Sequence, residues 1–422
     1  MQDGARIQSS IEILQDHFQT QAPLDRSLHH YFARRRYIGS KDRNAIRGHV
    51  YQVIRHYLPL EWWLEESRLF TKGSPRLLSI AALVLADKLD MKQINELFSG
   101  DKYQPHSLID EEQELVRTLE GQSMISEDQP LNVQVNCPDW IFEKTEDADL
   151  FRALNEEAPF DMRANILKGS FDAVHESLSS SVENITKIPG LESGLRAPRR
   201  LPIDQLKMFK DGWVEVQDAG SQKVCELMDV TPGQRVLDFC AGAGGKSLSL
   251  ASRMENKGQI YLSDTSEKRL ARAKVRLKRA GVHNYMIHAL SSETDGWVKK
   301  HRNKFDVVVV DAPCTGTGTW RRNPEARFRY DEESLAEMTD LQARILNSAQ
   351  RCVKPGGKLY YITCSVLADE NQIQAKDFVK ENEAFALTKD TQLLPHVDDT
   401  DGFYIAEFQK AAEKESERKD SK

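Results

Sequence analysis

The chain has 422 residues, of which 40% are hydrophobic and 29% are charged, and its formal net charge is −7. This length predicts about two to four domains with cores of their own. Six scattered cysteines without a Cys-X-X-Cys pair argue against a disulfide framework and a structural zinc site, and favour a reducing, cytoplasmic location. Neither a secretory signal nor a membrane span is expected near the start. The negative net charge by itself argues weakly against a nucleic-acid partner.

Residues 1–130 carry apolar side chains at steps of three and four, which predicts a helical domain. Ile46, Val50 and Val53 are an example of this spacing. Between Arg6 and Arg55 the segment has nine basic residues against four acidic ones. The pattern leaves two interpretations open: an accessory interaction domain, or a domain that contacts RNA.

The pattern changes near residue 130, where turn-forming residues interrupt the helical spacing. We predict a small α+β segment over residues 131–205. It would contain a helix at residues 140–154, and strands or loops with little core at residues 163–167 and 192–201.

Strands and helices alternate across residues 206–410. The predicted strands are residues 235–239, 259–263, 285–290, 305–310 and 358–363, and the predicted helices include residues 266–280 and 335–352. The nearly continuous apolar run at 305–310 is typical of a parallel strand buried on both faces. The alternation predicts a doubly wound α/β sheet. Residues 411–422, rich in Lys and Glu, are predicted to be a disordered tail.

A glycine-rich turn, Asp238-Phe-Cys-Ala-Gly-Ala-Gly-Gly-Lys-Ser247, follows the first predicted strand and opens a helix. Such glycines let the backbone approach a ligand closely, and the helix N-terminus favours anionic groups. A nucleotide P-loop requires glycine where this chain has Cys240, which disfavours that site. A dinucleotide site and an S-adenosylmethionine site both fit the turn. In either site Asp264 would bind the ribose hydroxyls, and in the latter Asp238 would hold the methionine end.

Two cysteines follow predicted strands at the edge where α/β sheets build their sites. Cys314 follows Asp311-Ala-Pro, and Cys364 lies between Thr363 and Ser365. A free cysteine most often only packs in a hydrophobic core. Two cysteines in polar connections between strand and loop instead favour a catalytic role. A thiolate that adds to C6 of cytosine makes C5 nucleophilic toward a methyl sulfonium. Asp311 would assist at cytosine N3, and Lys246 would favour the thiolate.

Together these residues resemble the Sun (Fmu-like) family of bacterial RNA cytosine-5 methyltransferases, in particular the small-subunit rRNA (RsmB-like) members. The resemblance covers residues 206–410 and implies a Rossmann-like methyltransferase domain with S-adenosylmethionine as cofactor. It implies cofactor contacts from Asp238, Cys240, Ala241, Gly242, Ala243, Gly244, Gly245, Lys246, Asp264 and Asp311. It also implies that Cys364 is the nucleophile and that Cys314 assists breakdown of the covalent adduct.

The sequence departs from this family after the third strand, where an acid facing the adenine is usual. Glu293 is only a weak substitute, so no contact is carried over there. Residues 1–130 loosely resemble a NusB-like RNA-binding domain, and residues 136–165 resemble the small RNA-binding segment of the family. The implied partner is RNA, most readily 16S rRNA, and the protein is expected to be a monomer. A tRNA substrate and a non-catalytic role in ribosome assembly stay open.

An arginine-rich loop follows Cys314 along the chain. Its basic residues are expected to contact RNA because they follow the predicted base pocket: Arg321, Arg322, Arg327 and Arg329. Trp320 and Phe328 would either stack on bases or pack the loop.

Overall fold

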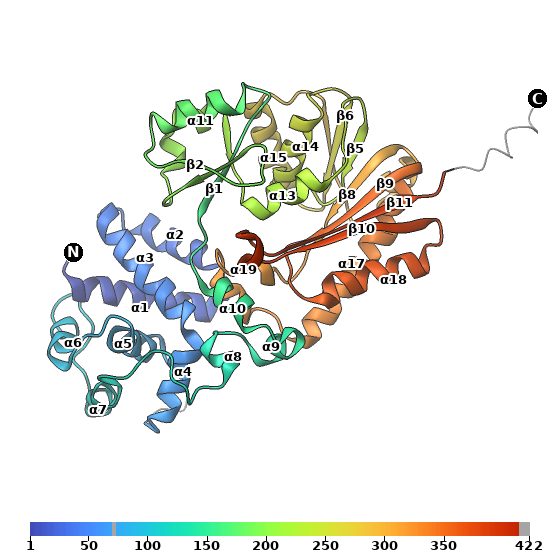
Figure 1. Cartoon of the computed structure of the whole chain (residues 1–422). Coiled ribbons are helices and arrows are strands. Elements are labelled where there is room, and N and C mark those ends of the chain that lie inside the picture. Colours follow the sequence, from blue (N-terminus) through green and yellow to red (C-terminus); the bar gives the residue numbers. More distant parts are fainter. Residues whose placement is uncertain (70–72, 413–422) are drawn as a thin grey trace, which may run out of the picture. The chain divides into compact units, whose positions relative to one another are not determined.

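The computed structural model describes residues 1–69 and 73–412 (Figure 1). The chain forms two compact units. The first comprises Met1–Glu156 together with Trp320–Asp331, and the second comprises Glu157–Thr319 and the residues from Glu332 onward. The predicted segment 131–205 is therefore shared between the units. The predicted tail lies outside the described residues from residue 413 onward. Within the described ranges, no helix is long and apolar enough to cross a membrane.

The first unit is helical, as the apolar spacing predicts. Its α-helices are α1 (Asp3–Thr20), α2 (Leu24–Arg34), α3 (Ser40–Arg55), α4 (Tyr57–Glu66), α5 (Pro75–Leu85), α6 (Met91–Leu97), α7 (Asp110–Leu119), α8 (Leu131–Gln134), α9 (Asp139–Thr145) and α10 (Ala148–Asn155). Helix α5 is central, since it packs against α1, α3, α4 and α7, and every residue from Leu77 to Leu85 is buried. Ser74 caps it by accepting a hydrogen bond from the amide of Leu77.

The arginine-rich loop packs into this helical unit instead of presenting its side chains to RNA. Trp320 is 1% exposed, stacks on Phe151, and has the guanidinium of Arg327 4.9 Å from its ring centroid. Arg327 is also 1% exposed and donates to the carbonyl of Asn136. Arg321 is buried as well. The expected RNA contacts of Arg321 and Arg327 are therefore wrong, because these side chains are buried in the unit. Of the two interpretations of Trp320, packing of the loop fits its burial against Phe151.

The second unit begins with a small antiparallel sheet in the order β2-β3-β1-β4. Its elements are β1 (Phe160–Ala164), α11 (Phe171–Ser179), β2 (Thr186–Lys187), β3 (Gly194–Ala197), η1 (Ile203–Gln205), α12 (Lys207–Lys210) and β4 (Val214–Val216). Helix α11 covers the sheet, and Met162, Leu178 and Leu195 are all fully buried in their shared core. The expectation of little core in this segment is wrong.

The large sheet of the second unit has the strand order β10-β11-β9-β8-β5-β6-β7. Its strands are β5 (Arg235–Asp238), β6 (Gln259–Asp264), β7 (Tyr285–Ala289), β8 (Phe305–Asp311), β9 (Val353–Thr363), β10 (Phe385–Leu393) and β11 (Phe403–Lys410). The first five pair in parallel, while β11 pairs antiparallel with both β9 and β10. The predicted doubly wound sheet is confirmed. Strand β9 begins earlier than predicted, and β10 and β11 are additions that the sequence pattern did not indicate.

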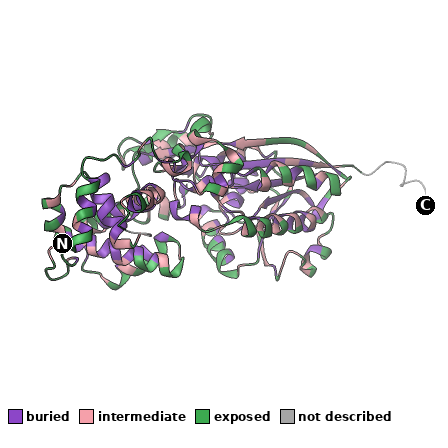
Figure 2. Cartoon of the chain, turned by 90° about the horizontal axis from the view of Figure 1, so that it is seen from below, coloured by how far each residue is buried: buried purple, intermediate pink, exposed green. Residues whose placement is uncertain are grey.

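Helices cover both faces of this sheet (Figure 1). They are α13 (Ala219–Leu227), α14 (Gly245–Arg253) and α15 (Glu267–Ala280) on one face, and α16 (Gly296–Lys300), α17 (Glu332–Ala349) and α18 (Gln372–Glu381) on the other. The sequence of strand β8 is apolar throughout because the strand is buried on both faces. Val307 and Val309 pack in one core, while Val308 and Val310 pack in the other. In Figure 2 the strands are largely buried and the outer helix faces are exposed.

Candidate active site

Asp238 ends β5 as a buried carboxylate, 1% exposed, at the start of the glycine-rich turn. Its Oδ2 accepts a hydrogen bond from Ser247 Oγ at 2.5 Å, because the first turn of α14 brings that hydroxyl back to the strand. Its Oδ1 is buried and has no hydrogen-bond partner in the described part of the chain. Burial raises the pKa of Asp238 to about 7. A buried acceptor without a donor marks a place for a ligand that donates.

The conformation of the turn is fixed by its glycines and by a side chain from a neighbouring helix. Gly242 and Gly244 adopt φ values of 54° and 77°, which favour glycine. The carbonyl of Ala243 accepts from Arg276 of α15 at 2.9 Å, which holds the middle of the turn. Gly245 begins α14, so the helix N-terminus follows directly. The predicted glycine-rich turn between β5 and α14 is thus present as a strand–turn–helix connection.

Asp264 ends β6, the neighbouring strand, and is 4% exposed. Its Oδ2 accepts from the Gly242 amide at 2.8 Å, and its Oδ1 accepts from the Ser266 amide at 2.7 Å. Arg269 lies 3.0 Å from Oδ1. Each carboxylate oxygen has two acceptor sites, so Asp264 keeps capacity for a further donor such as a ribose hydroxyl.

Lys246 and Asp311 form an ion pair beside the turn, with Nζ 2.7 Å from Oδ2. The side chain of Lys246 is 8% exposed, and that of Asp311 is 33% exposed. Burial acts to lower the pKa of Lys246, but the charge and hydrogen bond of Asp311, together with the interactions with Cys225 and Cys364, outweigh burial, and the pKa is raised. Lys246 therefore stays cationic. Its charge also interacts with Cys364.

Cys314 and Cys364 are brought together from the ends of β8 and β9. Their Sγ atoms are 3.3 Å apart, within hydrogen-bond distance for sulfur. The hydrogen bond with Cys364, together with burial, raises the pKa of Cys314 well above its ordinary value. Cys314 thus retains its proton and is the natural donor in the pair. Both thiols are partly buried and free of disulfides.

Two other residues named from the sequence have ordinary surroundings. Cys240 packs against the core on the α17 face, and burial raises the pKa of its thiol. Glu293 lies 3.2 Å from Arg344 on α17, so its charge is already engaged. The geometry therefore adds no reason to place Glu293 at the adenine.

Several contacts that the sequence did not indicate join the two cysteine loops to each other and to the residue before β11. Thr317 Oγ1 lies 3.0 Å from Ser365 Oγ and accepts a hydrogen bond from the Val366 amide. The backbones of Gly318 and Gly402 are in direct contact, and the Gly402 amide donates to the Gly318 carbonyl at 2.8 Å. These contacts could not be found from the sequence, because they join residues that only the sheet brings together.

The residues at this edge fit S-adenosylmethionine. The unpartnered Oδ1 of Asp238 suits a donated hydrogen bond from the ammonium of the methionine end. Asp264 suits the ribose hydroxyls, and the glycines of the turn allow close approach of the backbone to a ligand. No cluster of residues able to hold a metal ion occurs in the described ranges.

Comparisons with known proteins show which proteins this chain resembles. A family model described as 16S rRNA methyltransferase RsmB/F matches residues 225–409. A curated relative from Synechocystis sp., a probable ribosomal RNA small subunit methyltransferase B, is 32% identical over 317 residues. That match covers 69% of this chain and 71% of the relative.

Two solved structures share the fold. The crystal structure of PH0851 has a TM-score of 0.79 and 24% identity, covering 97% of this chain and 99% of that chain. A methyltransferase homolog protein from Pyrococcus horikoshii has a TM-score of 0.58 and 27% identity, covering 66% of this chain and 97% of that chain.

Proposed function

The chain belongs to the 16S rRNA methyltransferase RsmB/F family, and we propose that it methylates C5 of a cytosine in small-subunit rRNA. Membership of this family identifies the chain as an RNA methyltransferase that uses S-adenosylmethionine. When bound, this cofactor supplies an electrophilic methyl group. The observation that carries the choice of cytosine C5 is the pair of thiols 3.3 Å apart beside the Lys246–Asp311 ion pair.

In the proposed reaction Cys364 is the nucleophile. Its thiolate forms a bond to C6 of the cytosine, the electron pair of the C5–C6 double bond becomes a C4–C5 double bond, and the C4–N3 π pair moves onto N3, which takes up a proton. The resulting enamine makes C5 nucleophilic. In the Lys246–Asp311 ion pair the ammonium of Lys246 is the candidate donor to N3, where negative charge develops, and Asp311 assists at N3 by holding that ammonium. The cationic Lys246 also stabilises the thiolate before it attacks.

Cys314 acts when the adduct breaks down. After C5 has gained its methyl group, the C5 proton passes to solvent, the C6–sulfur bond breaks, and its electron pair returns to Cys364 as a thiolate. The thiol of Cys314 stabilises this leaving thiolate by donating a hydrogen bond. The short distance between the sulfur atoms and the raised pKa of Cys314 support this role.

The helical unit offers a surface for RNA around the connection between α2 and α3. Residues 24–43 contain six basic residues against two acidic ones, although the whole chain is negative. Tyr37 is 76% exposed. Arg34, Arg36 and Lys41 are exposed beside it in sequence. A tyrosine among cations suits stacking on an unpaired base with contacts to phosphates. We name residues 34–41 the α2–α3 basic surface.

The experiment that tests the function is sequencing of bisulfite-treated RNA from a strain that lacks the gene. A cytosine of 16S rRNA should lose its protection, and purified protein with S-adenosylmethionine should restore it. Loss of protection only in a tRNA would move the substrate to tRNA. Unchanged protection in all RNA, with no methyl transfer by the purified protein, would favour a non-catalytic role.

A further inference from the structure

Glu370 is a buried carboxylate that the mechanism above does not use. It ends η5 (Ala368–Glu370) and is 0% exposed. The groups that donate to its carboxylate are a backbone amide, a hydroxyl and a glutamine side chain, all of them uncharged. A buried carboxylate without a cationic partner is stabilised by the hydrogen bonds that it accepts. The groups that donate these bonds therefore indicate which part of the site Glu370 holds in place.

Those partners surround Cys314. Glu370 Oε1 accepts from the Thr315 amide at 2.8 Å, and Oε2 accepts from the Thr315 hydroxyl. Gln342 donates both to Glu370 Oε1 at 3.0 Å and to the Pro313 carbonyl at 2.9 Å. The residues on both sides of Cys314 are therefore tied to one carboxylate, directly or through Gln342.

The next residue does the same for the other cysteine. Asn371 Oδ1 accepts from the Thr363 hydroxyl, and its Nδ2 donates to the Ser365 carbonyl at 2.9 Å. Glu370 thus holds the flanks of Cys314 and Asn371 holds those of Cys364, while the Thr317–Ser365 contact also links the two loops. A change at Glu370 or Asn371 should affect mainly the cysteine that it holds.

We propose that Glu370 is a positioning residue that keeps the Cys314 thiol against Cys364 and so sets the rate at which the covalent adduct breaks down. This inference rests on the proposed function, because the role of Cys314 does. The negative charge of Glu370 also helps Cys314 to keep its proton.

The test compares Glu370→Gln with wild type for two rates, adduct formation and adduct breakdown, on an RNA substrate in single-turnover reactions read on denaturing gels. Gln keeps the shape but removes the charge and one acceptor. Breakdown should slow about tenfold, so that adduct accumulates, while formation changes less than about threefold. Asn371→Ala should show the reverse, with formation slowed more than breakdown.

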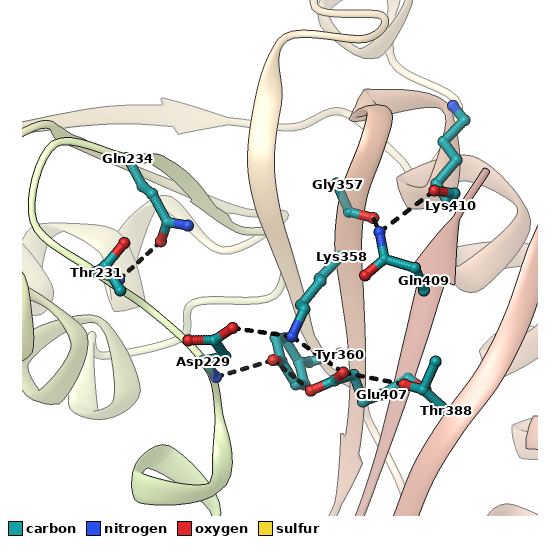
Figure 3. A network of polar contacts seen from close by, with 10 residues as sticks. All are labelled: Asp229, Thr231, Gln234, Gly357, Lys358, Tyr360, Thr388, Glu407, Gln409 and Lys410. Atoms are coloured by element: carbon teal, nitrogen blue, oxygen red, sulfur yellow. Dashed lines mark hydrogen bonds and ion pairs between the residues drawn. The ribbon is translucent and has the colours of Figure 1, made fainter. Parts of the chain in front are cut away.

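Glu407→Gln is the matched control. Glu407 lies on β11 of the large sheet and accepts from Tyr360 and Thr388 in a network with Lys358 (Figure 3). The Glu407→Gln variant should have a lower melting temperature, but its ratio of adduct formation rate to adduct breakdown rate should equal that of wild type. Thr315→Val, which removes only the hydroxyl contact, should slow breakdown about threefold and serves if Glu370→Gln does not fold.

The outcomes separate the inference from the function on which it rests. If Cys314→Ala forms no adduct, the proposed role of Cys314 in adduct breakdown fails whatever Glu370 does. If Cys314→Ala accumulates adduct while Glu370→Gln and Thr315→Val break it down at the wild-type rate, the positioning role is overturned. An equal loss of both rates in Glu370→Gln would also overturn it, because that is the result of a general structural role.

Discussion

Cys314 and Cys364 are 50 positions apart in the chain, yet their Sγ atoms lie 3.3 Å from each other. They meet because β8 and β9 are parallel neighbours in which Asp311 pairs with Ile362. The loops that follow these strands therefore start at the same edge of the sheet.

The two cysteines should respond differently to substitution. Cys364→Ala should lower methyl transfer by more than about a thousandfold, because it removes the nucleophile. Cys314→Ala should leave adduct formation intact and accumulate a protein–RNA adduct that survives denaturation. Transfer of labelled methyl groups and denaturing gels measure the two effects. Full activity of Cys364→Ala would show that the nucleophile is wrongly assigned.

Cofactor binding should depend on pH through Asp238. Its pKa is raised from 3.8 to about 7 by burial, and an ammonium donor favours its ionised form. Affinity for S-adenosylmethionine should rise with pH by up to about tenfold per unit below pH 7 and then level off. Calorimetric titrations at several pH values measure this. Asp238→Asn should bind weakly and without that slope, and an unchanged slope would contradict the assignment.

The same carboxyl should affect stability. Because its pKa is raised in the folded state, its contribution to stability is fully present below about pH 4 and is lost as the pH rises to about 7. Relative to Asp238→Asn, the free energy of unfolding of the cofactor-free protein should therefore fall over this window. Urea unfolding at about pH 5 and about pH 7 measures the difference, and a rise would have the wrong sign.

The close contact between Gly318 and Gly402 should not tolerate a side chain. A Cβ on Gly318 would clash with the Gly402 carbonyl oxygen, so Gly318→Ala should cost about 1–3 kcal/mol and displace the loop after Cys314. Gly48→Ala in α3 is the control, since a Cβ there meets nothing within 4 Å. Because alanine is the better helix former, this variant should raise the free energy of unfolding by about 0.5–1 kcal/mol. Similar unfolding curves and activities for the two variants would contradict the contact.

The α2–α3 basic surface should contribute to RNA affinity. Replacing Arg34 and Arg36 with Gln should weaken binding and reduce the salt dependence of the association constant by about one unit of slope for each lost phosphate contact. Tyr37→Ala should weaken binding to single-stranded RNA, whereas Tyr103→Ala, which alters another exposed tyrosine, should not. Filter binding at several salt concentrations measures this, and equal effects of both tyrosines would argue against a specific surface.

The sequence alone determined the features that depend on local chemistry. Apolar spacing is a local property, so the helical segment and five strands of the sheet were predictable from it. The glycine-rich turn, Asp264 and the two cysteines could be placed at one sheet edge because parallel strands end at the same side.

Tertiary structure decided what depends on contacts between distant residues. Trp320 and Arg327 follow Cys314 closely in the chain, yet both side chains are buried in the helical unit. The indole of Trp320 stacks on Phe151 there, a contact that nearness to Cys314 in sequence does not indicate. Strands β10 and β11 form by pairing with each other and with β9, which no local pattern records. Glu370 became a candidate only through hydrogen bonds to Thr315, 55 positions away. The sequence shows a carboxylate without its partners, and the role of Glu370 depends on the partners that the fold supplies.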